Sequence, residues 1–436
     1  MKLSYYNIIA SKSGRVALFN TVHDTYMVLS EDLYRKLQDN GYISKLENES
    51  PSLYEKLIRG GFIVKDELDE YQQLRKEYED SISNSRTYSL TLLPSLDCNL
   101  RCWYCFEKHI KGSHLEELTQ ERIFQHVKNV ITNDSTLERI ELELFGGEPL
   151  LYFEQEVYPL LKRIKEWLNF KRKECSFFFV TNGVRISSDN ISLFAELEAS
   201  FQISIDGYKT THDKVKFQKD KKGTYDHIID VIHLITQQSV FMYVNLRINY
   251  NDDTLAYLPN IIDDLHDIDR NKIGIHLERV WQTSSKKEIS NSLLKSVIDK
   301  FLLHDFSVSY MNLYRRNYSC KSSKNKQVVI SYDGNVFKCS GRDFNEQTKE
   351  GHLLNDGTIE WETDKQMKRL SICTFDNDTC RTCRLLPLCW GPCNQKLLET
   401  KDGNINHYCQ LKLMELSLND YVIFRFNSQY VKYNCK

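Results

Sequence analysis

Short apolar runs alternate with longer amphipathic stretches through the middle of the chain, from Tyr88 to about residue 280. Runs of this length, rich in β-branched and aromatic residues, are typical of buried strands, and the stretches between them repeat with a helical period. The alternation predicts strand and helix repeats that build a parallel sheet. The expected strands are 88–93, 141–146, 176–182, 201–206, 243–249 and 274–280, and the expected helices include Glu117–Thr132, Phe153–Phe170, Tyr225–Gln237 and Thr254–Leu265.

Six repeats are too few for a complete eight-stranded barrel, which normally needs about 250 residues. We therefore expect an α/β fold with a partial (β/α)6 TIM barrel over 86–305. Before it, three alternating runs at 5–10, 15–20 and 25–30 precede two short helical stretches, which predicts a small α+β domain over 1–64.

The segment 65–85 is almost wholly polar and is expected to be a helical linker. After about residue 305 the alternation fades and cysteines become dense. This change predicts a third module over 306–436.

Composition names no partner. Apolar residues make up 41% of the chain, charged residues 27%, and the formal charge is -2. Basic residues are interleaved with acids, so neither nucleic acid nor a membrane surface is an expected partner. The first residues lack the pattern of a signal peptide, and no apolar run is long enough to span a bilayer. We expect a cytoplasmic protein, in which clustered cysteines among the 13 present are metal ligands rather than disulfides.

The first cysteine group directly follows the first expected strand of the barrel. Cys98, Cys102 and Cys105 lie in the sequence DCNLRCWYC. Three thiolates on one loop can hold three irons of a cubane cluster and leave the fourth iron open, whereas most electron-transfer clusters have four protein ligands. A closed zinc site is the alternative, with His109 as its fourth ligand.

This loop resembles the cluster-binding loop of the radical SAM superfamily, with Tyr104 as the aromatic residue before the third cysteine. The resemblance implies a [4Fe-4S] cluster whose open iron binds S-adenosylmethionine. It also implies reductive cleavage of that cofactor to a 5'-deoxyadenosyl radical. In such enzymes the cofactor supplies the difficult chemistry and the protein positions it.

Later strand ends carry further residues that match the superfamily. The sequence FGGEP resembles its GGE motif, in which the backbone and the Glu meet the methionine amino group. On its own this short motif is more often a plain turn, and the polar residues at the next strand ends can equally cap or form turns. The expected cofactor contacts, beside Tyr104, are Gly146, Gly147, Glu148, Asn182, Ser204, Asp206 and Arg247.

The second cysteine group lies in the last module. It resembles the SPASM domain of peptide-modifying radical SAM enzymes, which holds two auxiliary [4Fe-4S] clusters. Zinc binding by the CxxC ladder is the alternative. By position, the resemblance assigns Cys320, Cys339 and Cys393 to the first auxiliary cluster and Cys380, Cys383, Cys389 and Cys409 to the second.

The first auxiliary set then has three ligands. Either Cys373 supplies the fourth, or that iron is open to a substrate thiolate, which the softness of iron clusters permits and which we favour here. Cys175 and Cys435 match neither pattern. We interpret them as a small buried apolar residue and a tail thiol.

The N-terminal domain resembles the winged-helix peptide-recognition element of maturases that act on ribosomally made peptides. A leader peptide there adds as a strand to a sheet edge; a scaffold without ligand is the alternative. The interpretation is a peptide maturase that forms a thioether, carbon-carbon or similar crosslink, with flavodoxin or ferredoxin as electron donor. Glu278 and Arg279, at the last strand end, are the candidates for substrate contact or base.

Two alternatives remain. Oxidation of a single side chain, as in sulfatase-maturing enzymes, is disfavoured because Ser340 follows Cys339 where those enzymes have an Asp, and Asp343 is displaced. A non-catalytic iron-sulfur or zinc binding module would need neither the GGE motif nor an open iron. No phosphate loop or GxSxG motif supports kinase or hydrolase chemistry.

Overall fold

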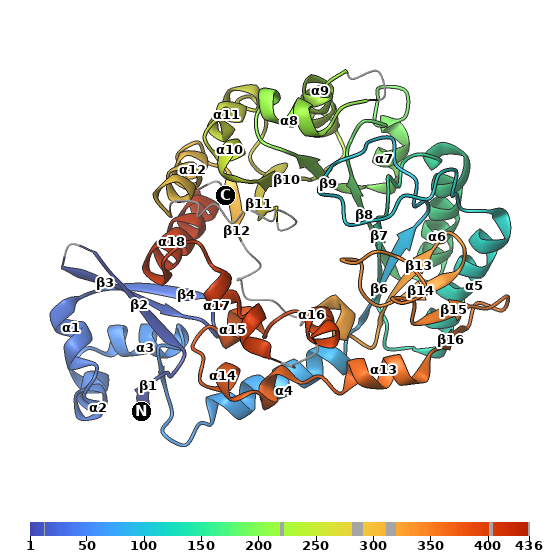
Figure 1. Cartoon of the computed structure of the whole chain (residues 1–436). Coiled ribbons are helices and arrows are strands. Elements are labelled where there is room, and N and C mark those ends of the chain that lie inside the picture. The colour runs from blue at the N-terminus through green and yellow to red at the C-terminus, as the bar shows by residue number, and fades with distance from the viewer. Residues whose placement is uncertain (13, 219–221, 281–290, 311–319, 401–403, 435–436) are drawn as a thin grey trace.

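The computed structural model describes residues 1–12, 14–218, 222–280, 291–310, 320–400 and 404–434. Its main element is a curved sheet with helices along its outside (Figure 1). Seven neighbouring strands of this sheet are parallel and follow chain order. They are β6 (Thr87–Leu93), β7 (Arg139–Leu144), β8 (Glu174–Thr181), β9 (Ser200–Ile205), β10 (Val244–Tyr250), β11 (Ile273–Arg279) and β12 (Ser307–Tyr310).

The α/β class and all six expected strands are confirmed, and β12 adds a seventh parallel strand at one edge. The helices that connect the strands bury an apolar face against the sheet, and their side chains join one continuous core. They are α5 (Glu117–Asn133), η1 (Phe153–Val157), α6 (Tyr158–Phe170), α7 (Ile191–Leu197), α8 (Lys209–Val215), α9 (Tyr225–Thr236), α10 (Asp252–Leu255), η2 (Leu258–Asn260), α11 (Ile261–Asp264) and α12 (Asn291–Leu303).

One expected helix is wrong in form. The stretch from Thr254 to Leu265 is not a single helix but the three short pieces α10, η2 and α11. Pro259 lies in the middle piece, and a proline has no N–H to donate to the preceding turn.

The N-terminal residues form a three-stranded antiparallel sheet with three helices and a small two-stranded ribbon. They have an apolar core of their own around Leu18, Leu37 and Phe62, while Ile8 and Phe19 join the core of the main sheet. The elements are β1 (Lys2–Leu3), β2 (Asn7–Lys12), β3 (Arg15–Asn20), β4 (Thr25–Ser30), α1 (Glu31–Lys36), α2 (Asn40–Glu49), α3 (Pro51–Arg59) and β5 (Ile63–Val64).

The polar segment that follows contains a helix, α4 (Glu70–Ser83), which runs beneath the cysteine-rich residues (Figure 1). Two buried side chains of this helix, Leu74 and Tyr78, pack with Tyr6, Phe375, Leu386 and Trp390 in a cluster that we call the aromatic core. The N-terminal residues, α4 and the cysteine-rich residues therefore share one interior.

The last part of the chain extends the main sheet and then winds back along it. Strand β13 pairs in parallel with β6, and β14 to β16 continue the sheet as an antiparallel meander. The elements are η3 (Lys321–Ser323), β13 (Gln327–Ser331), β14 (Asn335–Phe337), β15 (Gly351–Leu353), β16 (Ile359–Trp361), α13 (Thr363–Leu370), η4 (Thr374–Asp376), α14 (Asp378–Arg381), α15 (Leu386–Cys389), α16 (Asn394–Glu399), η5 (Ile405–Tyr408), α17 (Gln410–Leu413) and α18 (Leu418–Asn434).

None of the helices described here has the length and apolar character needed to cross a membrane.

Candidate active site

A cavity of about 650 Å³ lies at the carboxyl edge of the parallel strands. Its volume is within the range of ordinary ligand pockets. Parallel strands bring their carboxyl ends to one edge, which is why residues far apart in the sequence meet there. The predicted site residues that line it are Cys98, Cys102, Tyr104, Cys105, Gly146, Gly147, Asn182, Ser204, Arg247, Glu278 and Arg279.

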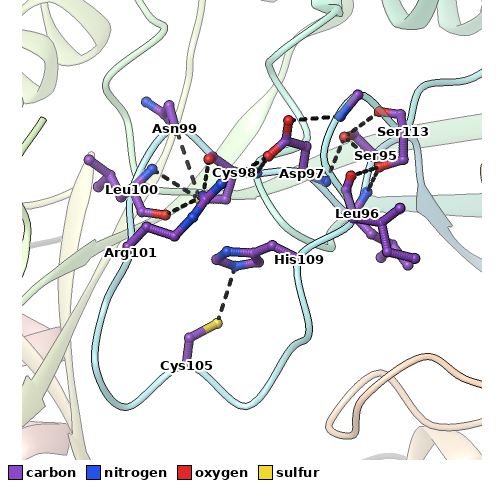
Figure 2. Close-up of polar contacts among 12 residues, drawn as sticks. Ser95, Leu96, Asp97, Cys98, Asn99, Leu100, Arg101, Cys105, His109 and Ser113 are labelled. Carbon is purple, nitrogen blue, oxygen red and sulfur yellow. Dashed lines mark hydrogen bonds and ion pairs between the residues drawn. The ribbon is translucent and has the colours of Figure 1, made fainter. Parts of the chain in front are cut away.

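The loop that carries the first three cysteines is folded by its own polar contacts. Asp97 accepts hydrogen bonds from the Cys98 N–H at 2.8 Å and the Gly112 N–H at 3.0 Å, so its carboxylate ties the two ends of the loop together. The Ser95 hydroxyl donates to the carbonyl oxygen of Ser113 at 2.7 Å at the base of the loop (Figure 2). These contacts fix where the cysteines leave strand β6.

The thiols of this loop are neighbours in a partly buried setting. Burial, followed by the charges of Glu148 and Cys102, raises the pKa of Cys98 to about 12. Burial likewise raises the pKa of Cys105 to about 11. A thiol with a raised pKa is protonated at neutral pH, so binding a metal here must displace protons.

Cys105 also contacts His109, with 3.6 Å between Sγ and Nε2 (Figure 2). This contact is the one a zinc site would use. Yet among the residues described, no three His, Cys, Asp or Glu side chains converge closely enough to share one metal ion. The described residues of this loop are therefore not arranged as a preformed site for a single ion.

The two glycines of FGGEP are needed where the strand end meets the cysteine loop. A Cβ on Gly147 would lie 2.1 Å from the carbonyl oxygen of Asp97, and its φ is +42°. The Gly147 N–H donates to the Glu107 carboxylate at 2.6 Å. The sequence predicts that the backbone at these glycines approaches a ligand. In the structure the same backbone also lies close to the cysteine loop.

Glu148 occupies a different place from the one expected. Its side chain is fully buried behind the cavity and is not among the lining residues that the structure describes. Its carboxylate accepts from the Thr181 hydroxyl at 2.7 Å and from the backbone N–H of Asn182 at 2.9 Å. Glu148 therefore holds the end of β8 against the GGE turn.

Asp206 is also buried behind the lining and acts through Tyr104. The Tyr104 hydroxyl donates to Asp206 Oδ1 at 2.6 Å, which holds the ring beside the cysteines. Lys216, which the sequence reasoning missed, lies 3.8 Å from Asp206 Oδ2 and donates to Ser204 Oγ at 2.9 Å. It is 4% exposed and lines the cavity, so its ammonium is a buried positive charge at the site.

The charge on Lys216 is maintained by its neighbours. Burial alone would lower its pKa, but Tyr104, Cys102 and Asp206 keep the pKa well above the usual range. A buried ammonium can form a strong, charge-assisted hydrogen bond with a ligand carboxylate. In the sequence, Lys216 resembles any lysine at the end of a helix, and no pattern predicts that it is buried.

The next two strands contribute polar groups to the same wall. Asn182 donates through Nδ2 to Asn99 Oδ1 at 2.8 Å, which links β8 to the cysteine loop. Arg247 lines the cavity beside Ser204, its register partner, and donates weakly to Asn249 Oδ1 at 3.3 Å. Asn249 in turn donates to the Tyr104 hydroxyl at 3.1 Å.

The two candidate catalytic residues have different partners. Glu278 lies 3.2 Å from His276 Nε2. Burial would raise the Glu278 pKa, but the His276 hydrogen bond and the charge of Arg247 lower it overall. Glu278 is therefore an ionised base at neutral pH. Arg279 pairs with Glu415, which also accepts from the Tyr250 hydroxyl, so its guanidinium has a structural partner.

The later cysteines form two separate groups of neighbours. The thiols of Cys320 and Cys393 raise the pKa of Cys339, after burial, to about 11. Those of Cys380, Cys383 and Cys409 raise the pKa of Cys389, after burial, to about 12. These neighbours agree with the two ligand sets that the resemblance to the SPASM domain implies.

Among the residues described, two cysteines belong to neither of these groups. Cys175 lies within β8, and Cys373 packs on the aromatic core. The predicted tail thiol, Cys435, lies outside the described residues.

The cavity reaches from the first cysteine loop to the first of the later groups. Ser340, Gly341 and Arg342, which follow Cys339, line its far side. Lys321 and Lys396, which lie next to Cys320 and close to Cys393 in sequence, complete that wall. One chamber therefore adjoins two thiol groups.

Comparisons with known proteins agree with this geometry. Residues 92–267 match the family model described as the radical SAM superfamily. The chain is 22% identical to the radical SAM cyclopropyl synthase TigE of Paramaledivibacter caminithermalis, over 92% of this chain and 90% of that protein. It is 23% identical to a cysteine-type anaerobic sulfatase-maturating enzyme of Clostridium novyi, over 74% of this chain and 93% of that protein.

Solved structures show the same fold. The structure of anSMEcpe with bound AdoMet and Cp18Cys peptide superposes with a TM-score of 0.56 at 17% identity, covering 80% of this chain and 97% of that chain. Streptococcus suis SuiB bound to the precursor peptide SuiA gives 0.52 at 16% identity, covering 94% and 100%. The chain thus contains a radical SAM domain over residues 92–267 and is an enzyme.

Proposed function

We propose that this enzyme modifies a ribosomally made precursor peptide, joining two of its residues through a thioether, carbon-carbon or similar bond. Cys98, Cys102 and Cys105 would hold a [4Fe-4S] cluster and leave one iron for S-adenosylmethionine. When bound, this pair supplies a 5'-deoxyadenosyl radical that removes a hydrogen atom from the substrate. The residues that line the cavity would bind, orient and shield the reactants.

The observation that carries the proposal is the single cavity between two thiol groups. It adjoins the first cysteine loop on one side and the segments beside Cys320, Cys339 and Cys393 on the other. A peptide residue held there would lie between the site of radical formation and an acceptor for the second electron. We propose auxiliary clusters on Cys320, Cys339 and Cys393 and on Cys380, Cys383, Cys389 and Cys409.

The lining also suits the cofactor. Lys216 offers a buried ammonium for the methionine carboxylate, and Arg247 a second cation beside Ser204. Gly146 and Gly147 expose backbone at the turn where an amino group would be met. Glu278, which is ionised, is the candidate to accept a proton, with Arg279 as a positioning residue.

The solved structures of similar proteins favour a peptide substrate. SuiB was solved with its precursor peptide and anSMEcpe with a peptide. We assign 1–64 to a winged-helix peptide-recognition domain, 65–85 to a linker, 86–305 to the radical SAM partial barrel and 306–436 to a SPASM domain. The outer strand β4 has one edge that no other strand covers among the residues described, and it could pair with an added strand.

Flavodoxin or ferredoxin as the electron donor, and a cytoplasmic location, complete the proposal.

Oxidation of a single side chain is the second candidate, supported by the likeness to sulfatase-maturating enzymes. Ser340 follows Cys339 and lines the cavity, where those enzymes would place an acid. The nearby Asp343 accepts from the Lys108 N–H at 2.8 Å, so its carboxylate supports the cysteine loop. These contacts favour the crosslinking activity.

The test is to incubate the anaerobically reconstituted enzyme with S-adenosylmethionine, dithionite and synthetic peptides from short open reading frames beside the gene. Crosslinking removes two hydrogen atoms from the peptide and joins two residues, which tandem mass spectrometry locates. If one residue alone is oxidised, the second candidate replaces the first. If deoxyadenosine forms and no peptide changes, a peptide substrate is contradicted.

A further inference from the structure

Of the cysteines that the structure describes, two remain after the three proposed ligand sets are filled: Cys175 and Cys373. The second auxiliary set has four thiols and is complete, whereas the first has three. A cluster closed by protein has four thiolates. The fourth ligand of the first set is therefore Cys175, Cys373 or a group of the substrate.

Two observations place Cys373 close to the later cysteine groups, and the second of them favours the first auxiliary set. The side chain of its neighbour Thr374 abuts Gly391, where an added Cβ would lie 1.8 Å from Thr374 Cγ2. Gly391 lies two residues after Cys389 and two before Cys393, so this contact places Cys373 between the two auxiliary sets. On the other side, Tyr78 of α4 has both Cys373 and Cys320 among its electrostatic neighbours and hydrogen bonds to the Asn394 side chain.

The Cys373 thiol has the local geometry of the assigned ligands. In several of these, the backbone N–H two residues on donates to Sγ, as from Leu100 to Cys98 and from Gly341 to Cys339, each at 3.4 Å. The same pattern occurs at Cys105, Cys383 and Cys389, and at Cys373, which accepts from Phe375. Such hydrogen bonds stabilise a thiolate.

Cys175 differs in every respect. It lies within strand β8, and its thiol is influenced by burial and then by the charges of Lys165, Glu198 and Arg139. Its position on a strand offers no turn that could direct Sγ toward a cluster.

A second kind of observation points to a group beside Cys373. Thr374 Oγ1 and Trp390 Nε1 are buried polar atoms without a hydrogen-bond partner in the described residues. Thr374 is 1% exposed and Trp390 7% exposed. Trp390 packs against Phe375 and Tyr78 with ring centroids 6.3 and 5.8 Å apart. Buried donors are rarely left unpaired, and cluster sulfur is an acceptor for them.

We propose that Cys373 is the fourth thiolate of the first auxiliary cluster, so that this cluster is closed by the protein and no substrate thiolate binds it. The helix α4 then covers the cluster through Tyr78, and the substrate is held by the cavity wall instead. The inference rests on the proposed auxiliary clusters. It reverses the preference, drawn from the sequence, for an open iron.

The test uses the full chain with Cys98, Cys102 and Cys105 changed to Ala, which leaves the auxiliary clusters alone. After anaerobic reconstitution this parent should hold about eight irons, four for each cluster. Isotopically labelled cyanide is added to the reduced protein, and its hyperfine coupling to a cluster is measured by electron-nuclear double resonance. Cys373→Ala and the matched control Cys175→Ala are made in the parent.

We expect no cyanide coupling in the parent or in Cys175→Ala. In Cys373→Ala we expect either a new coupling or a loss of about half the iron. A Cys373→Ser variant, which keeps the side-chain size, separates loss of a ligand from misfolding. Its circular dichroism spectrum should match that of the parent. It should nevertheless bind cyanide or lose iron.

Cyanide coupling already present in the parent and unchanged in Cys373→Ala would overturn the proposal, as would a Cys373→Ala protein identical to the parent. A parent without iron would contradict the auxiliary clusters themselves. That outcome is separate from the formation of deoxyadenosine by the unaltered enzyme.

Discussion

At the residue scale, the buried side chain of His212 makes the stability of the fold depend on pH. His212 is fully buried, its Nδ1 accepting from the Asp206 N–H at 3.1 Å and its Nε2 lying 2.9 Å from Thr224 Oγ1. Burial, followed by the charge of Lys216, lowers the His212 pKa from 6.5 to about 3. The folded ring is therefore neutral where the unfolded ring would be protonated.

The stabilising contribution of a neutral His212 is full above pH 6.5 and is lost as the pH falls toward 3, since only the unfolded chain gains the proton. The loss amounts to about 5 kcal/mol at its limit. We predict that His212→Gln is less stable than the natural protein at pH 7 but loses less stability between pH 6.5 and 4. Urea unfolding of the apoprotein at each pH measures this. If the unfolding free energies of the variant and the natural protein change equally with pH, His212 is not the source of the pH dependence.

Lys216 is predicted to be essential for both stability and cofactor binding. Lys216→Met leaves Asp206 buried without its cation, which should cost about 3 kcal/mol of unfolding free energy. Binding of S-adenosylmethionine should fall at least about tenfold if a carboxylate contact is lost. The exposed Lys214, two residues earlier on α8, gives the control Lys214→Met. Equal stability and affinity in the two variants would contradict the role of Lys216.

The residues that could be predicted from the sequence are those whose chemistry requires close spacing. Cysteines on one loop or ladder must share a ligand-sized space, so Cys98, Cys102 and Cys105 could be grouped by distance along the chain. Lys216 could not, because its burial results from how α8 packs on the strands. Glu148 and Asp206 were located at the correct strand ends, but their inward direction depends on the fold.

At the scale of elements, the join between β7 and the cysteine loop is the most constrained. Gly147 and Gly112 both have positive φ, +42° and +74°, but only Gly147 faces close backbone, while nothing lies within 4 Å of a Cβ on Gly112. We predict that Gly147→Ala displaces the loop and loses about four irons, the content of one cluster. Gly112→Ala should cost only about 1 kcal/mol of backbone strain. Iron analysis with thermal melting distinguishes them, and equal iron contents would contradict the account.

The strands could be predicted because they are short runs rich in apolar, β-branched and aromatic residues; in β9 and β10 every second residue is buried, which is the period of a strand. The helix α2 was missed although Ile43 and Leu46 form its buried face, because two apolar positions in ten residues give a weak period. The division of the stretch around Pro259 could have been anticipated from the proline itself.

At the scale of the whole molecule, the two ends of the chain are fastened together. Arg425 of α18 donates to Asp24 at 2.6 and 2.8 Å, across 401 residues. Helix α18 also packs on β2, β3 and α12, so it joins the N-terminal sheet to the main fold. None of this could be predicted from the sequence, because no local pattern encodes a contact over such a separation.

We predict that Asp24→Asn lowers the unfolding free energy by about 2 kcal/mol, because Arg425 is left partly buried with a weaker partner. Asp66→Asn, which removes an exposed pair with the N-terminal amine, should change it by less than about 0.5 kcal/mol. Urea unfolding of both variants provides the comparison. If the two variants are equally stable, the ion pair between Asp24 and Arg425 does not stabilise the fold.

The central claim is that Cys98, Cys102 and Cys105 hold the cluster that cleaves S-adenosylmethionine. The most direct test is to reconstitute the protein without oxygen, reduce it with dithionite, add S-adenosylmethionine and measure 5'-deoxyadenosine beside the variant with all three cysteines changed to Ala. The account predicts deoxyadenosine from the natural protein alone, with iron for about three clusters, falling by about four irons in the variant. Zinc in place of iron, with the cofactor left intact, would contradict it.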